Sequence, residues 1–591
     1  MCGICGEFRF DGGEPDVAAL DRMMEVLVPR GPDSGDKKVI GSLALGHRRL
    51  AIIDLSERGA QPMQDKETGH WLVFNGTIYN YRELRQQLAG QGHRFISESD
   101  TEVILKAYAQ WGTKCVEHFV GMFAFVLWDV KQQTLFMARD RLGIKPLYYS
   151  RDSQRIRFAS NPQALLAAGD VDTSFDAVAL HHHLTLHAVV PAPRTILSGV
   201  RKLPPATSLI LQSNGKSEQY QYWNLTAQRP AEKIDEQEWI DRVHTSLRLA
   251  VDRRRLAADV PVGVLLSGGL DSSLLVALLC EAGQDDLQTF SVGFEDQPEE
   301  KGSEFEFSDQ VVERYQTQHH KIHIPNDQVL KRLPEAVQYM AEPMFGQDAV
   351  AFFLLSEQVS QHVKVVQSGQ GADEVFAGYF WYSKMVEDIN GEYTDRFARY
   401  YFDREHEEYL QTVANKYHGE DYTRQKIASL LNEPDADEFI DRILRMDVTT
   451  LVIDDPVKRV DNMTMAFGLE ARVPFLDSGL VELAAQMPPH MKLGSGGKHV
   501  LKEISRGLLP DAVIDRPKGY FPMPALKYVR GEFLDFMRGI LLSDTARQRG
   551  LYQSAYVEKL LSEPDQHFTR LQGSKLWHLA LLELWLQTHL G

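Results

Sequence analysis

Residues 260–273 read VPVGVLLSGGLDSS, and this stretch decides the fold of the second half of the chain. Its continuous apolar start, residues 260–266, predicts a buried strand of a parallel sheet. A glycine-rich turn follows and leads into a helix over residues 274–281. Such a turn offers backbone N–H groups and the positive end of a helix dipole to an anion. Because the turn does not read G-x-x-x-x-G-K-[ST], ordinary phosphoryl-transfer ATPase chemistry is not indicated.

The S-G-G-x-D-S pattern of this turn resembles the pyrophosphate loop of ATP pyrophosphatases, which cleave ATP to AMP and pyrophosphate. Residues 289–294 and 362–369 read as two more buried strands, in keeping with a nucleotide-binding sheet whose site lies at the strand ends. The resemblance implies that the residues contacting ATP are Leu266, Ser267, Gly268, Gly269, Asp271, Ser272, Ser273, Val292, Ser368 and Gly369.

Two acidic residues follow the predicted strands: Asp271 in the turn and Asp373 after residues 362–369. Mg²⁺ takes oxygen ligands and bridges phosphates, so we expect both carboxylates to hold Mg²⁺. For Asp373 the alternative is a capping role on the next helix.

Four later motifs resemble the C-terminal domains of asparagine synthetases: residues 461–465, 470–477, 498–503 and 516–521. The resemblance implies that Lys518 neutralises the charge that grows on the phosphates and the adenylate as ammonia attacks. It also implies that Glu342 takes a proton from ammonia.

The first half begins MCGICG, so removal of Met1 would leave Cys2 with both a thiol and a free α-amine. An α-amine has a pKa of about 8 and can accept the thiol proton, which makes one residue both nucleophile and base. A thiolate of this kind attacks acyl carbons such as the side-chain amide of glutamine and releases ammonia. Cys2 and Cys5 could instead form half of a zinc or redox site, but no second C-x-x-C follows.

Three other places in the first half have a structural and a chemical interpretation. Arg49, within the strand-like residues 43–54, is either a surface charge or a carboxylate clamp. Asn75-Gly76, after a predicted strand over residues 71–74, is either a turn or an oxyanion hole. Residues 99–102 precede a helix, so they either cap it or present Asp100 to a substrate ammonium.

The motifs CGICG, RGPD, HRRLAIID, NGTIYN, SDTE and ARDRLGIKPLYY occur in this order. Together they resemble the glutaminase domain of class II glutamine amidotransferases, in the asparagine synthetase branch. The resemblance implies that Cys2 is the nucleophile and that Asn75 and Gly76 form the oxyanion hole. The implied glutamine contacts are Arg49 to the α-carboxylate, Asp100 to the α-ammonium, and Ile52, Ile53, Asn75, Gly76 and Thr77 along the pocket. Thr77 stands where many relatives have Glu, and a contact through its backbone would tolerate the change.

The length of 591 residues predicts more than one domain, since a single core rarely exceeds ~250–300 residues. The resemblances imply an α+β Ntn-type glutaminase domain, with stacked antiparallel sheets between helices. An α/β ATP-pyrophosphatase domain with a parallel sheet follows it. We place the glutaminase domain at residues 2–212, a linker at 213–236 and the synthetase domain at 237–591.

The formal net charge of −18 argues against a nucleic-acid partner, because phosphate binding needs clustered Lys and Arg. No apolar run reaches the ~18 residues of a membrane span, and nothing before Cys2 could serve as a signal peptide. We therefore expect a reduced, soluble, cytoplasmic protein, and we leave a homodimer open. The histidines within residues 181–187 and 319–323 are expected to be structural rather than metal ligands.

Taken together, these motifs predict a glutamine-hydrolysing, ATP-dependent amidotransferase. One half frees ammonia, the other adenylates a carboxylate, and a water-poor passage joins them. A tRNA-modifying enzyme is opposed by the net charge. A non-catalytic protein would not need Cys2, Asp271 and Lys518, and a β-lactam-forming cyclase would have no use for an intact glutaminase site.

The acceptor is predicted from three stretches: residues 186–194, 342–344 and 368–379. They resemble the N-acetylglutaminylglutamine amidotransferases, which amidate the C-terminal carboxylate of an acetylated dipeptide to make an osmoprotectant. Gln370 replaces an acid that asparagine synthetases usually carry, which suits an acceptor without an α-ammonium. Asparagine synthetase, with aspartate as acceptor, is the alternative.

Overall fold

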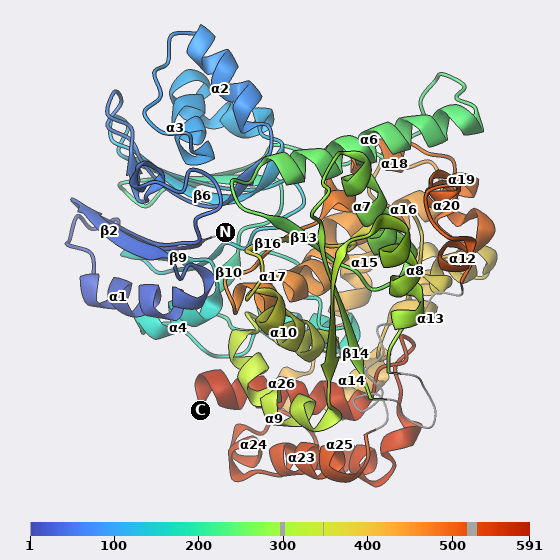
Figure 1. Cartoon of the computed structure of the whole chain (residues 1–591). Helices are drawn as coiled ribbons and strands as arrows, with labels where there is room; N and C mark the ends of the chain where they lie inside the picture. Colours follow the sequence, from blue (N-terminus) through green and yellow to red (C-terminus); the bar gives the residue numbers. More distant parts are fainter. Residues whose placement is uncertain (1, 296–301, 347, 517–528) are drawn as a thin grey trace.

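The computed structural model of the chain describes residues 2–295, 302–346, 348–516 and 529–591. They form an N-terminal sandwich of two antiparallel sheets and a C-terminal unit built on a parallel sheet (Figure 1). This arrangement confirms the predicted fold class.

Over the described residues, the N-terminal sandwich consists of two six-stranded antiparallel sheets. The first sheet has the order β10-β8-β9-β1-β3-β2, with β1 (Gly3–Arg9), β2 (Ser34–Ile40), β3 (Leu43–Arg49), β8 (Tyr148–Arg151), β9 (Arg155–Ala159) and β10 (Arg201–Lys202). The second has the order β12-β11-β7-β6-β5-β4, with β4 (Met63–Gln64), β5 (Trp71–Ile78), β6 (Gly121–Asp129), β7 (Thr134–Arg139), β11 (Thr207–Gln212) and β12 (Ser217–Gln221).

Alternate residues of these strands form the core between the sheets, as the pleat requires; they include Phe8, Leu45, Val73, Val126 and Trp128. Helices α1 (Val17–Val26) and α4 (Pro162–Ala168) cover one outer face (Figure 1). Helices α2 (Tyr81–Gly90) and α3 (Asp100–Trp111) cover the other. β12 lies within the stretch predicted as a linker, and α6 (Glu236–Leu256) begins at its far end.

The parallel sheet has the order β15-β14-β13-β16-β17, with β13 (Val262–Leu265), β14 (Gln288–Phe294), β15 (Gln318–Ile324), β16 (Val365–Gln367) and β17 (Glu470–Arg472). Val264 points into a core with α6 and α7 (Leu270–Glu281). The next residue, Leu265, points into a second core with α10 (Asp348–Val359) and α17 (Lys458–Met465). Both faces of the sheet are therefore covered, which explains the continuous apolar runs.

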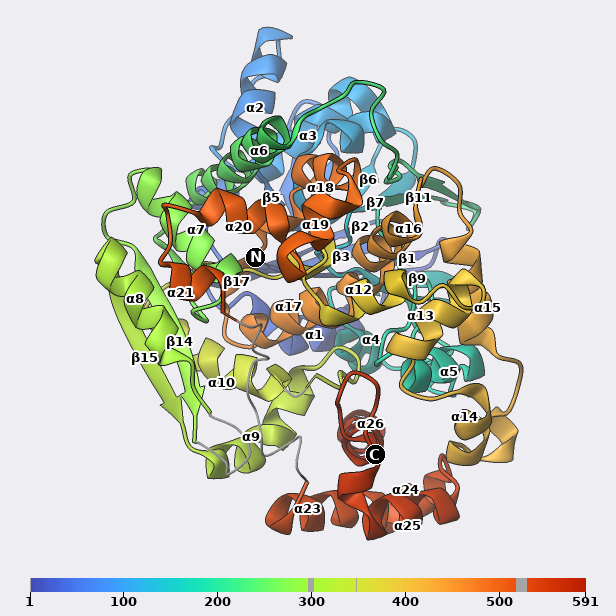
Figure 2. The ribbon, with the colours of Figure 1, turned by 90° about the vertical axis from the view of Figure 1, so that its right-hand side faces the viewer.

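The remaining α-helices of the described residues belong mostly to the C-terminal unit, which reaches the end of the molecule opposite α2 (Figure 2). They are α5 (Ala177–Thr185), α8 (Phe305–Tyr315), α9 (Asn326–Tyr339), α11 (Ala372–Val375), α12 (Phe380–Glu387), α13 (Tyr393–Tyr401), α14 (His406–Thr412), α15 (Tyr422–Leu431), α16 (Phe439–Met446), α18 (Ser478–Ala485), α19 (Pro489–Leu493), α20 (His499–Ser505), α21 (Asp511–Ile514), α23 (Gly531–Leu541), α24 (Asp544–Arg549), α25 (Ser554–Ser562) and α26 (Lys575–Leu590). Within the described ranges, no helix combines the length and apolar character needed to span a membrane.

Candidate functional site

The first candidate site surrounds Cys2, which precedes β1 and lies against β5 of the other sheet. The backbone N–H of Cys2 donates a hydrogen bond to Asn75 Oδ1 at 3.0 Å. Cys2 is 8% exposed, and this burial raises the pKa of its thiol. Asn75 Nδ2 is buried and has no hydrogen-bond partner in the described part of the chain. This amide is therefore available to an oxyanion, as the predicted role requires.

Gly76 lies where the backbone of β6 leaves no room for a side chain on β5. It lies inside β5 opposite Phe123, so the turn that was the alternative interpretation is absent at this position. Its φ of +150° is unfavourable for residues with a side chain, and a Cβ there would lie 2.1 Å from the backbone oxygen of Met122. Only glycine fits this position.

Arg49 is buried at the end of β3, so the surface-charge interpretation is wrong. Its Nη1 donates to the backbone oxygen of Ser56 at 2.9 Å, and its Nη2 donates to that of Asp54. These contacts hold the loop that carries Ile52 and Ile53, both of which are buried. The guanidinium is thus fixed beside the residues predicted to line the glutamine pocket.

Asp100 is the first residue of α3, but the capping residue is Ser99, whose side chain accepts from the backbone N–H of Thr101 at 3.0 Å. Asp100 Oδ2 instead accepts from the backbone N–H of Ile78 at 3.0 Å. Burial raises the pKa of Asp100 to about 7. A substrate ammonium beside Asp100 would offset that burial and favour the ionised carboxylate.

Thr77 connects this site to the second half of the chain, a contact that the sequence did not reveal. Its Oγ1 donates to Glu470 Oε1 at 3.3 Å. Glu470, on β17, is fully buried and accepts from Arg472 Nε at 2.5 Å. Although burial alone would raise it, the pKa of Glu470 lies at about 2, with Arg472 and Lys145 among the cations that lower it. The synthetase half therefore supplies a carboxylate beside Thr77, where the resemblance led us to expect Glu.

The second candidate site is a cavity of about 710 Å³ at the carboxyl ends of the parallel strands. Of the residues predicted to contact ATP, those that line it are Leu266, Ser267, Gly269, Asp271, Ser272, Val292, Ser368 and Gly369. Gly268, with a φ of +75°, faces the backbone of Ser308, and Ser273 is fully buried. Helix α7 begins at Leu270, before the predicted start, so Asp271 lies in its first turn.

Lys498 is a site residue to which the sequence gave no role. Its Nζ lies 2.6 Å from Asp271 Oδ2 and 2.7 Å from Asp373 Oδ1. Burial would lower the pKa of Lys498, but the two carboxylates raise it above its ordinary value. Asp373 lies within α11, whose N-cap is Gly371, so the capping interpretation of Asp373 is wrong. The motif KHVLKE contained the only sequence signal for Lys498.

The predicted Mg²⁺ ligands fit a divalent cation in their chemistry and spacing. Asp271 and Asp373 offer carboxylate oxygens that both reach a single ammonium group, so one small cation could contact both. Lys518, the predicted partner of the phosphates, lies outside the described residues.

Glu342 does not line the cavity but lies buried where the two halves meet. Its Oε1 accepts from the hydroxyl of Tyr148 at 3.1 Å and from Lys202 Nζ at 3.1 Å. Lys202 also pairs with Asp454 at 2.6 Å. The carboxylate predicted to take a proton from ammonia therefore lies in a network that both halves supply, and not in the cavity.

The same interface contains a second buried charge cluster around Asp461. Arg30 Nη1 lies 3.0 Å and Lys145 Nζ 3.2 Å from its two carboxylate oxygens. The two halves are thus joined by buried ion pairs. Removal of one partner from a buried pair lowers the stability of the fold far more than removal of one partner from an exposed pair.

Beyond the phosphate-binding loop, the cavity wall is rich in acids: Asp348, Glu374, Asp447 and Asp455. Asp447 and Asp455 come from consecutive π-helical turns between α16 and α17, a feature often found at functional sites. Arg459 pairs with Asp455 at 2.8 Å and with Asp348 at 3.1 Å. Gln370 also lines this cavity, but four acidic residues surround it. The replacement of one acid by Gln370 therefore does not by itself favour an acceptor without an α-ammonium.

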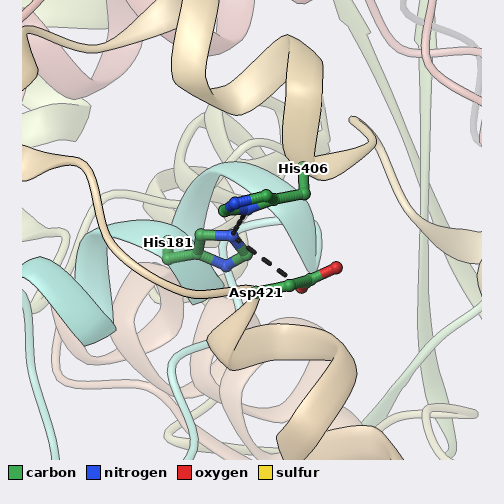
Figure 3. Close-up of side chains that lie close together, drawn as sticks. All are labelled: His181, His406 and Asp421. Atoms are coloured by element: carbon green, nitrogen blue, oxygen red, sulfur yellow. Dashed lines mark hydrogen bonds and ion pairs between the residues drawn. The ribbon is translucent and has the colours of Figure 1, made fainter.

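His181 of α5 lies beside His406 and Asp421, which are far away in the sequence (Figure 3). His181 Nε2 lies 3.0 Å from His406 Nδ1 and 3.9 Å from Asp421 Oδ1, so a carboxylate does join a histidine that was expected to be structural. His181 and Asp421 each have a further structural partner. His181 Nδ1 contacts Thr423 Oγ1 at 2.7 Å, and Asp421 caps α15 by accepting from the backbone N–H of Arg424.

Two family models match the chain. The asparagine synthase model matches residues 242–587, and the glutamine amidotransferase domain model matches residues 1–223. Asparagine synthetase [glutamine-hydrolyzing] 3 of Bacillus subtilis is 30% identical, over 100% of this chain and 99% of its own. Asparagine synthetase [glutamine-hydrolyzing] 1 of the same organism is 29% identical, over 99% and 96%. Amidase chry2 of Gibberella zeae is 27% identical, over 89% of each chain. The chain therefore belongs to the asparagine synthase family, as a glutamine-dependent carbon–nitrogen ligase with an N-terminal glutamine amidotransferase domain.

Proposed function

We propose that this ligase adenylates a carboxylate and amidates it with ammonia released from glutamine at Cys2. The observation that carries the proposal is the presence in one chain of two sites, one with a nucleophile and one with a cluster of charged residues. Cys2 lies against Asn75 in one site, and Asp271 and Asp373 surround Lys498 in the other. We retain the division into residues 2–212, 213–236 and 237–591 as a proposal.

In the first site, the α-amine left by removal of Met1 takes the thiol proton of Cys2. The thiolate then attacks the side-chain amide carbon of glutamine. Asn75 Nδ2 and the Gly76 N–H stabilise the oxyanion, ammonia leaves, and water hydrolyses the thioester to glutamate. Arg49 binds the α-carboxylate of glutamine and Asp100 its α-ammonium.

In the second site, the acceptor carboxylate attacks the α-phosphorus of ATP and pyrophosphate leaves. Ammonia then attacks the acyl-adenylate and AMP leaves. Glu342, which lies outside the cavity, would take a proton from ammonia at the interface of the two halves. Lys498 and the N-terminus of α7 stabilise the phosphate charge. Mg²⁺ held by Asp271 and Asp373 would neutralise further phosphate charge, and Lys518 keeps its predicted role.

We propose N-acetylglutaminylglutamine as the acceptor, on the motifs around residues 186–194 and 368–379. Aspartate is the second candidate, because the acidic wall of the cavity could receive its α-ammonium. The test is mass spectrometry of the products formed from ATP, Mg²⁺, glutamine and each acceptor in turn. The amide of the acetylated dipeptide is expected, and asparagine as the only amide would overturn this choice of acceptor.

A further inference from the structure

His187 is a residue of the cavity wall to which the chemistry described so far assigns no role. His187 lines the cavity but belongs to the N-terminal half, in the segment after α5. The residues predicted for ATP come instead from β14, β16 and the start of α7. His187 therefore reaches the cavity from a segment that supplies none of the predicted ATP contacts.

The backbone at His187 is held in a conformation that side-chain-bearing residues avoid. His187 has a φ of +52° and Ala188 a φ of +64°. Two consecutive non-glycine residues in the left-handed region are unfavourable, and such strain tends to persist where a side chain must be aimed for function.

The imidazole of His187 is oriented by a buried partner. Its Nδ1 lies 3.1 Å from Asp403 Oδ2, and Asp403 is fixed in turn by its backbone N–H, which donates to the oxygen of Thr185 at 2.8 Å. His578 Nδ1 lies 3.4 Å from the same carboxylate oxygen. The ring of His578 stacks on Phe345, another cavity residue, at 3.9 Å. Three segments distant in sequence thus converge to fix one ring.

This arrangement leaves Nε2 as the remaining polar atom of His187, with no hydrogen-bond partner among the described residues. Burial alone would lower the pKa of His187, but Asp403 raises it above the ordinary value. When the ring is protonated, both of its nitrogens are donors, and Nε2 can then donate into the cavity. A hydrogen-bond acceptor, such as a carbonyl or carboxylate oxygen, is the chemistry that this atom can recognise.

We propose that His187 donates a hydrogen bond from Nε2 to an oxygen of the acceptor substrate other than those of its reacting carboxylate. That oxygen is either an amide carbonyl, as in an acylated peptide, or a second carboxylate, as in a dicarboxylic amino acid. The inference rests on the proposed amidotransferase function and adds an acceptor-recognition residue to it. Asp403 acts as the positioning residue that aims the ring.

The test compares His187→Gly with Ala188→Gly, because both relieve the same backbone strain and only the first removes the ring. Ammonium chloride serves as the nitrogen source, so that the glutaminase site is bypassed. Pyrophosphate release is measured against the concentration of N-acetylglutaminylglutamine and, separately, of aspartate. Thermal unfolding and the KM for ATP are followed in parallel.

We expect His187→Gly to raise the KM for the acceptor at least tenfold, with an unchanged KM for ATP and no loss of thermal stability. Ala188→Gly should leave the acceptor KM within twofold of the parent. An effect with the acetylated dipeptide identifies a carbonyl as the bound oxygen, and an effect with aspartate identifies its second carboxylate.

Parental turnover with an unchanged acceptor KM in His187→Gly would overturn this inference alone. Stoichiometric zinc retained by the dialysed parent and lost in His187→Gly would also overturn it, because His187, Asp403 and His578 would then be metal ligands. A parent that releases no pyrophosphate with either acceptor would overturn the proposed function together with the inference.

Discussion

Glu470 of the parallel sheet accepts a hydrogen bond from Thr77 of the glutaminase sheet at 3.3 Å, although 393 positions separate the two in the chain. The contact brings a buried carboxylate close enough to Asp100 to contribute, after burial, to the raised pKa of that group. The ionisation of the proposed glutamine site therefore depends on a residue of the other half.

The first prediction concerns pH. Asp100 has a raised pKa of about 7, so below that pH it is mostly protonated and cannot pair with the ammonium of glutamine. The KM for glutamine should rise as the pH falls through 7, by up to about tenfold per unit, and should level off above it. Glutamate release between pH 5.5 and 8.5 measures this. Asp100→Asn should give a high KM that no longer changes with pH, and a parental KM that is flat across the range would contradict the assignment.

Glu470→Gln should move this profile. Removal of the negative charge lowers the pKa of Asp100, because Glu470 is one of the groups that raise it. The rise in KM should then begin at a lower pH than in the parent. Glutamine retains an oxygen that can accept from Thr77 and Arg472, so the hydrogen bonds are conserved. An identical profile in the variant would show that Glu470 has no electrostatic influence on the site.

Cys2→Ala should separate the two activities. Without the thiol, glutamine is not hydrolysed, whereas ammonium chloride still supplies nitrogen to the second site. Glutamate release should fall at least about a thousandfold, as expected for loss of a covalent nucleophile. AMP formation with ammonium should stay within a few-fold of the parent. Continued glutamine-dependent amide formation by this variant would refute the role of Cys2.

Lys498→Met should produce the opposite separation. The substitution removes the cation between Asp271 and Asp373 and should lower AMP formation by about 10²–10³, the usual effect of losing one charge-stabilising group. Glutamate release by Cys2 provides the internal control, because it reports on a folded chain. Equal losses in both activities would indicate misfolding rather than a local role.

Lys202→Met should destabilise the whole chain. It leaves the carboxylates of Glu342 and Asp454 buried without their shared partner, a change that typically costs about 3–5 kcal/mol. Lys364→Met is the matched control, since Lys364 pairs with Asp33 across the same two halves at a partly exposed position, where the expected loss is about 0–1 kcal/mol. Urea unfolding measures both. Similar losses would mean that burial does not set the strength of these pairs.

The parts of the fold that could be predicted are those set by local pattern. The apolar run before Ser267 predicted a buried strand, which the structure confirms, because apolar side chains in succession suit a strand that is covered on both faces. The glycine-rich turn before a helix was also predicted from local pattern, and the anion site at that turn stays a prediction. Cys2 and Asn75 were recognised from ordered motifs, and the structure brings them together.

The contacts that could not be predicted join residues far apart in the chain. No local signal in the sequence links the partners of these contacts, since each pair forms only when the two halves fold together. The pairs are Thr77 with Glu470, Lys202 with Glu342, and His181 with Asp421. The prediction from Gln370 considered a single position, because no local signal indicated that Asp447 and Asp455 reach the same cavity from a distant helical segment.

The ion pairs around Asp461 and Glu342 also constrain how the molecule can change over generations. A substitution at Arg30, Lys145 or Lys202 removes a cation from a buried carboxylate that is encoded between 140 and 431 codons downstream. Substitutions in one half are therefore constrained by the buried charges of the other. A glutaminase half transplanted from a distant homologue would fold well on this synthetase half only if it carried cations at the matching positions.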